Sequence, residues 1–77
     1  MRLAHQSRAN RYGVRWDLVD FNFVHLIYDG KCGICGLSVS KEEMTIDHIV
    51  PLSRGGPHVL SNLQPAHSSC NTKKGAR

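Results

Sequence analysis

A chain of 77 residues with a formal net charge of +4 and an isoelectric point of about 9.3 is long enough for one small domain and favours an anionic partner. On charge alone, the alternative is an ordinary solvated surface. No apolar run is long enough to span a membrane, and no segment typical of a secretory signal follows Met1. A domain this small often needs a metal or disulfides, and the three cysteines cannot all pair with one another. A reducing, cytoplasmic setting is the expectation.

The first 30 residues divide into a basic arm and an apolar segment. Residues 1–12 are basic and polar, and their composition fits either a short helix or a disordered arm. Residues 18–28 are apolar on more than one face, which predicts a buried helix. Asp17 is its expected N-cap and Asp29-Gly30 its expected stop. A strand through residues 21–23 is the alternative.

All five aromatic side chains of the sequence precede Gly30. The second half therefore lacks a large ring with which to build a core. We expect residues 1–30 to pack on residues 31–77 and to supply their hydrophobic cover. On this basis residues 1–77 form a single domain, with the basic arm and apolar helix in its first 30 residues and a metal-clipped core in the remainder.

Two pairs of metal-binding side chains bracket the second half of the chain. Cys32 and Cys35 lie in a glycine-containing C-x2-C turn, and His67 and Cys70 lie in an H-x2-C turn. Three sulfurs and one nitrogen make a donor set that Zn2+ binds in a closed tetrahedron. Neither pair completes such a site alone, so the spacing predicts a structural zinc that clips the two turns together. The alternative is a redox pair with a free third thiol, although a thioredoxin-like βαβ context is missing.

Between the two turns, the sequence predicts two strands followed by a final helix. Residues 45–50 are rich in β-branched side chains and predict a strand, which a proline and a Gly-Gly pair bring to an end. Asp47 and His48 therefore lie near a strand end, where a catalytic pair can be held rigidly. Residues 63–66 are expected to run antiparallel to this strand. Ser68 or Ser69 is then the expected N-cap of a terminal helix.

These elements carry three motifs, CGICG, DHIVPLSRGG and SNLQPAHSSCNTKKG, which begin at Cys32 and end at Gly75. In this combination they closely resemble the HNH nucleases, also called ββα-metal or His-Me finger endonucleases. The resemblance implies an α+β fold, in which an N-terminal helical segment packs on a ββα-metal core clipped by a structural zinc. It covers a little over half of the chain and gives no match for the first 30 residues.

The resemblance also assigns roles to individual residues. The first His of the family motif falls on His48, its middle Asn on Asn62, and its last His or Asn on Asn71. Asp47 takes the acidic position that often precedes the first His. Two departures are that Asn71 gives an H-N-N version and that His67 stands where the second knuckle more usually has Cys. Neither departure removes a required chemistry.

The function implied is a metal-dependent hydrolysis of DNA phosphodiester bonds. His48 is the expected general base on water, and Asn62 is expected to aim its ring. Asp47 and Asn71 offer hard oxygen ligands for one catalytic Mg2+ or Mn2+. Contacts to the flanking phosphates are expected from three basic side chains: Arg54, Lys73 and Lys74.

Two other functions are compatible with the sequence. One is a zinc-knuckle DNA-binding module without cleavage activity, which would not need the set of Asp47, His48, Asn62 and Asn71. The other is an accessory subunit of a larger phage or mobile-element complex. Small HNH proteins occur in phages beside packaging genes, so the resemblance allows a packaging partner, although no residue indicates one. Three further histidines are expected to be structural or exposed: His5, His25 and His58.

Overall fold

The computed structural model describes residues 13–75 as two helices, a two-stranded sheet and two short 3-10 helices. In chain order these are α2 (Phe21–Ile27), β1 (Met44–His48), η1 (Leu52–Arg54), η2 (Leu60–Asn62), β2 (Leu63–His67) and α3 (Ser68–Lys74). The expected arm over residues 1–12, with His5, lies outside the described residues. Within residues 13–75, no helix is long and apolar enough to cross a membrane.

The two strands pair antiparallel along their full lengths, so that His48 at the end of β1 lies opposite Leu63 at the start of β2. β2 begins where it was expected and runs one residue further. β1 starts one residue before the predicted strand and ends two residues before it. The early end arises because the backbone N–H of Val50 donates to the side chain of Asn62, at 2.9 Å, instead of to a strand partner. Asp47 and His48 are consequently the last two residues of β1.

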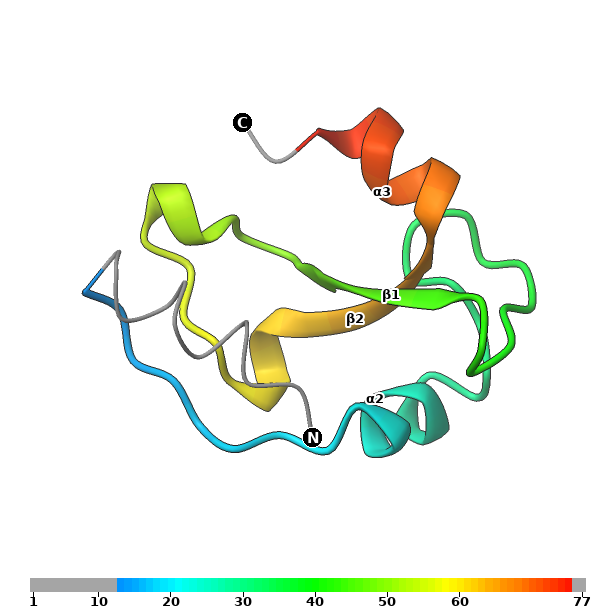
Figure 1. Ribbon diagram of the computed structural model, residues 1–77, viewed down its shortest axis with the longest axis horizontal. Coiled ribbons are helices and arrows are strands. Elements are labelled where there is room, and N and C mark those ends of the chain that lie inside the picture. Colours follow the sequence, from blue (N-terminus) through cyan, green and yellow to red (C-terminus); the bar gives the residue numbers. More distant parts are fainter. Residues whose placement is uncertain (1–12, 76–77) are drawn as a thin grey trace.

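The sheet lies between the two helices, with α3 over one face and α2 under the other (Figure 1). The main cluster of buried apolar residues joins the α2 segment to the sheet and consists of Val19, Val24, Ile46 and Leu63. A smaller cluster lies beside the cysteine turn and consists of Cys32, Val39 and Ala66. β1, β2 and α3 thus form a ββα unit on which the N-terminal helical segment packs, which confirms the expected α+β fold.

α2 begins three residues later than its predicted cap would place it. Its N-cap is Asp20, whose carboxylate accepts a hydrogen bond from the backbone N–H of Asn22 at 2.9 Å. The prediction of Asp17 as the cap was wrong, because the backbone N–H of Asp17 instead donates to the carbonyl of His58 at 2.7 Å. The alternative of a strand through residues 21–23 was also wrong. Val24 is the buried residue of this helix, so α2 covers the sheet with one face rather than being buried all round.

α3 begins at Ser68, and its N-cap is His67, which makes no side-chain capping bond. The prediction that Ser68 or Ser69 caps this helix was therefore wrong, since both are helical. The imidazole of His67 points to the cysteines instead of to the helix N–H groups. α3 ends at Lys74, and Gly75 follows with a φ of +68° that a residue with a side chain rarely adopts.

Candidate functional site

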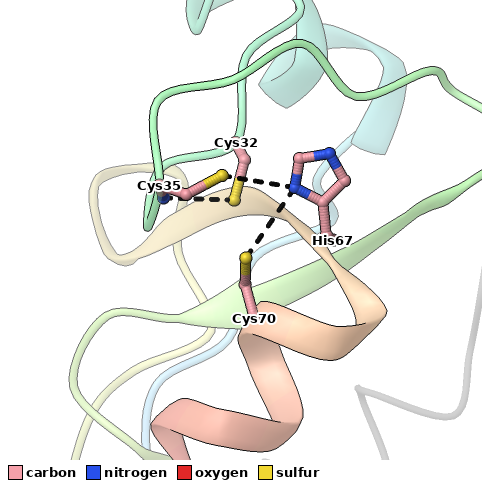
Figure 2. A group of neighbouring side chains, drawn as sticks. All are labelled: Cys32, Cys35, His67 and Cys70. Carbon is pink, nitrogen blue, oxygen red and sulfur yellow. Dashed lines mark hydrogen bonds between the residues drawn. The ribbon is translucent and has the colours of Figure 1, made fainter.

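Four side chains from two turns distant in sequence converge on one point (Figure 2). Cys32 and Cys35 come from the turn after α2, His67 is the last residue of β2, and Cys70 lies in the first turn of α3. Their ligand atoms all lie within 4.8 Å of one another. Nδ1 of His67 is 3.4 Å from Sγ of Cys35 and 3.8 Å from Sγ of Cys70. A tetrahedral zinc separates its nitrogen and sulfur ligands by about 3.6 Å. The cluster is therefore a Cys3His site compatible with a structural zinc, and its convergence does not fit the redox alternative, in which the third thiol stands apart.

Backbone groups hold these ligands in place. The amides of Ile34 and Cys35 point at Sγ of Cys32, at 3.4 and 3.5 Å. Nε2 of His67 lies 2.9 Å from the carbonyl of Ser38, and a hydrogen bond donated there leaves Nδ1 as the ligand atom. The site thus has the second layer of hydrogen bonds that metal-binding histidines ordinarily require.

The electrostatics of the cluster favour a bound cation. Burial raises the pKa of the Cys32 thiol, but backbone hydrogen bonds, of which that of Cys35 is the largest, outweigh it and bring this pKa down to about 6. Burial, together with the neighbouring sulfurs of Cys35 and Cys32, raises the pKa of Cys70 to about 11. The bond with Cys32 raises the pKa of His67. One thiolate therefore opposes ionisation of the next, and a dication among the sulfurs would relieve that repulsion.

A second polar cluster lies at the end of β1. Asp47 is 6 % exposed, and its Oδ2 accepts hydrogen bonds from Nε2 of Gln64 at 2.7 Å and from Nζ of Lys74 at 2.8 Å. Gln64 lies directly opposite Asp47 on β2. The Lys74 ammonium also donates to the carbonyls of His48 at 2.7 Å and Ile49 at 3.2 Å. Three oxygens of the chain therefore surround one cation at the end of this strand.

Gln64 also contacts the cysteine turn. The backbone N–H of Gly33 donates to the carbonyl of Pro65 at 2.8 Å, which brings the turn against β2. A Cβ atom at Gly33 would lie 2.9 Å from Cβ of Gln64 and would collide with its amide oxygen. Glycine at this position therefore leaves room for the side chain that holds Asp47.

His48 is joined to a second histidine. It is 8 % exposed, and its Nε2 lies 3.0 Å from Nδ1 of His58, which is 4 % exposed. Burial lowers the pKa of His58, and the nearby Asp17 carboxylate opposes this shift. His58 was expected to be structural or exposed, and it is buried against His48, the residue predicted to be the base. His25, by contrast, has a structural contact, since its Nε2 lies 2.7 Å from the carbonyl of Val39.

Asn62 fastens the loop that leads from β1 to His58. Its Oδ1 accepts from the backbone N–H of Val50 at 2.9 Å, and its Nδ2 donates to the carbonyls of Val50 at 3.0 Å and Pro57 at 2.8 Å. Gly56 allows this close approach, because a Cβ there would collide with the carbonyl of Val50 and lie 2.9 Å from Nδ2 of Asn62. The side chain of Asn62 thus fixes the start and the end of the loop at once.

Asn71 lies on α3, and its Nδ2 donates to Oγ1 of Thr45 at 3.1 Å. Thr45 and Asp47 are two residues apart in β1, so they lie on the same face of the strand. Asn71 and Asp47 are therefore both on the side of the sheet that α3 covers.

The segment that carries both clusters matches a known family. The model of the HNH endonuclease family matches residues 32–77, which is more than half of the chain. The chain belongs to the HNH endonuclease family. A search of curated proteins gave no match. The match includes all four residues of the Cys3His site and every residue to which the HNH motifs assign a role.

The expected HNH residues lie on both sides of the end of β1. Asp47 and Asn71 are on the α3 side, and His48, the next residue along the strand, contacts His58. Arg54 is exposed in η1 and Lys73 is exposed on α3, so both side chains can reach a ligand in solvent. Lys74 differs, because its ammonium is bonded to Asp47 and to two carbonyls. Phosphate contacts from Arg54, Lys73 and Lys74 stay a prediction.

The sequence analysis assigned no functional role to His58 or Gln64. For Gln64, the pairing of the two predicted strands could have indicated one. Once residues 63–66 are paired antiparallel with the first strand, a register can be written that places Gln64 opposite Asp47, and an amide beside a carboxylate suggests a hydrogen bond. No comparable signal exists for His58, because its contact with His48 depends on how the loop closes.

Proposed function

We propose that this HNH protein is a metal-dependent DNA endonuclease that hydrolyses phosphodiester bonds. The observation that carries the proposal is the burial and hydrogen bonding of Asp47 and His48 at the end of β1. Both side chains are buried. Asp47 is held by Gln64 and Lys74, and His48 contacts His58. A binding module has no need to fix a carboxylate and an imidazole at the end of one strand, whereas hydrolysis requires such preorganised groups.

In this proposal His48 acts as the general base. A neutral imidazole accepts a proton from water at physiological pH, and the resulting hydroxide attacks the phosphorus. The bond between phosphorus and the 3′ oxygen breaks, and the 3′ oxygen leaves with the electron pair and takes a proton from solvent. Asp47 and His48 are the last two residues of β1, and their side chains point to opposite faces of the sheet. The scissile phosphate must therefore approach the end of the strand to meet both. Asn62 supports this arrangement through the loop, since its side chain bonds to backbone groups on both sides of that loop.

The catalytic ion is proposed to be Mg2+ or Mn2+, with Asp47 and Asn71 as its protein ligands. The two side chains suit such an ion, because a carboxylate and an amide both offer hard oxygen donors and both lie on the side of the sheet that α3 covers. When bound, the ion would neutralise charge on the phosphate and on the departing 3′ oxygen. Asp47 would orient the ion, and Lys74 would hold the carboxylate in position from its other side.

The Cys3His site is proposed to hold a separate, structural Zn2+. Soft sulfur ligands and four protein donors leave no open position for water, so this ion does not enter the reaction. Its role would be to join the turn after α2 to the start of α3 in a domain with few buried apolar side chains among residues 13–75. A reduced, cytoplasmic setting is proposed because the site needs all three thiols unpaired.

DNA is the proposed partner, bound through phosphate contacts that do not read sequence. The positive net charge and the exposed side chains of Arg54 and Lys73 support this. We further infer that residues 1–77 act as one domain, because the segment before β1 supplies half of the main apolar cluster. No described residue supports the hypothesis of a phage packaging partner.

The test is cleavage of supercoiled plasmid by zinc-loaded protein, with and without Mg2+ or Mn2+. We expect relaxation of the plasmid only with the added ion. His48→Gln should abolish cleavage and keep zinc content unchanged, because the base is lost but most of the side-chain volume remains. His25→Gln is the matched control, since it changes a histidine outside the site, and it should cleave normally. Cleavage by His48→Gln at the wild-type rate would disprove the assigned base, and DNA binding without cleavage by the wild type would favour the binding module.

A further inference from the structure

We propose that His58 is a positioning residue that sets the tautomer of His48. The inference rests on the proposed function of His48 as a base and adds the residue that prepares it. Nε2 of His48 lies 3.0 Å from Nδ1 of His58, and the ring centroids are 5.2 Å apart with an angle of 47° between the planes. Both residues are buried, at 8 % and 4 % exposure, so bulk water does not compete strongly for this bond.

The pairing of these two atoms links the protonation of both rings. A hydrogen bond between two imidazole nitrogens needs one N–H and one lone pair. If Nε2 of His48 donates, neutral His48 has its lone pair on Nδ1, and neutral His58 carries its proton on Nε2. If Nδ1 of His58 donates, both rings are in the Nδ1–H form. In that second case Nδ1 of His48 already carries a proton and cannot accept one from water.

One property of the imidazole ring favours the first arrangement. The Nε2–H form is the more populated tautomer of a neutral histidine side chain in water, and the first arrangement gives this form to both rings at once. Burial lowers the pKa of His58, which keeps this ring neutral in either arrangement. Nδ1 is therefore the nitrogen of His48 that would take the proton from water.

The backbone around His58 keeps its ring at this position. Its N–H donates to the carbonyl of Arg15 at 2.8 Å, and its carbonyl accepts from the N–H of Asp17 at 2.7 Å. The preceding residue, Pro57, is held by the side chain of Asn62 at 2.8 Å. The middle Asn of the HNH motif thus acts on His48 through the loop and through His58. This explains how Asn62 can orient the base while its own amide is bonded to loop backbone.

The direct test is 15N NMR of zinc-loaded protein labelled at histidine, which distinguishes the tautomers by the chemical shifts of the two ring nitrogens. We expect His48 of the wild type to be in the Nε2–H form. His58→Asn places an amide oxygen near the position of Nδ1 and should keep that form. His58→Phe fills a similar volume without an acceptor and should give His48 a mixture of both tautomers. His25→Asn, the control, should leave the His48 signals unchanged.

Plasmid cleavage supplies the second readout. His58→Phe should lower kcat by about tenfold with a smaller change in KM, since it removes orientation of the base and not substrate contacts. His58→Asn should recover most of that loss. A wild-type His48 in the Nδ1–H form, or a His58→Phe variant with unchanged tautomer and kcat, would overturn the inference. If the wild type cleaves no DNA yet its His48 loses the Nε2–H form in His58→Phe, the positioning role stands and the proposed nuclease function fails.

Discussion

Replacement of Lys74 by methionine removes one ammonium and keeps most of the side-chain length. In the structure this ammonium donates to Oδ2 of Asp47 at 2.8 Å and to the carbonyls of His48 and Ile49. The side chains of Lys74 and Asp47 are 28 % and 7 % exposed. After the substitution, the buried carboxylate would keep its bond to Gln64 but lose its counter-ion.

The expected loss in the free energy of unfolding lies between the values for a buried and for an exposed ion pair. Removing one partner of a buried ion pair destabilises a protein by about 3–5 kcal/mol. An exposed pair contributes about 0–1 kcal/mol. Because Asp47 is buried but water reaches part of Lys74, we expect an intermediate loss of about 2–3 kcal/mol. With an m value of about 1 kcal/mol/M in urea, the unfolding midpoint of Lys74→Met should fall by about 2–3 M.

The assay is urea unfolding of zinc-saturated protein, followed by circular dichroism. Lys73→Met is the matched control, because Lys73 is the preceding residue of α3 and is exposed. It should change the free energy of unfolding by no more than about 0.5 kcal/mol. The double variant Lys74→Met/Asp47→Asn should recover at least half of the loss, since it removes the uncompensated charge. Equal midpoints for Lys73→Met and Lys74→Met would refute the reasoning and make Lys74 an ordinary solvated lysine.

Three further predictions concern the zinc, the loop and the DNA. Elemental analysis should find one Zn2+ per chain, and Cys70→Ser should lower both the zinc content and the helical signal; a folded protein without zinc would contradict this. Gly56→Ala should destabilise the protein by about 1–3 kcal/mol and reduce plasmid cleavage, because its Cβ collides with the carbonyl of Val50. Gly55→Asn, at a φ of +86° with open space around it, should change stability by no more than about 1 kcal/mol. DNA affinity should fall with rising salt, and replacing Arg54 and Lys73 by Gln should reduce the slope of log K against log salt by about 2. An unchanged slope would mean that neither residue contacts phosphate.

The sequence predicted the ββα order and the Cys3His site because each depends on local patterns. Cysteines and a histidine at fixed spacing identify metal ligands, and the β-branched run before Asp47 identifies a strand. The ends of the elements were harder to predict, because tertiary contacts decided them. Asp17 and Asp20 are both good N-caps, but only the backbone bond from Asp17 to His58 shows which one is used. A sequence contains no sign of such a bond between residues far apart in the chain.

The sequence also did not predict which way the side chains of Lys73 and Lys74 point. Lys73 and Lys74 are adjacent and chemically alike, so a composition argument treats both as phosphate contacts. In the structure Lys74 donates to the end of β1 while Lys73 is exposed. The contact between His48 and His58 was not predictable for a related reason. It requires the loop between them to close in one way, which the bonds of Asn62 determine.

The absent side chain at Gly33 has a consequence for how this sequence can vary. The space that a Cβ would fill at Gly33 is taken by Gln64, whose amide holds Asp47. A larger residue at position 33 could therefore be accommodated only if position 64 became smaller, and Asp47 would then lose a partner. These two positions should change together or not at all. The sequence of the turn that carries Cys32 and Cys35 is therefore coupled, through Gln64, to the environment of Asp47.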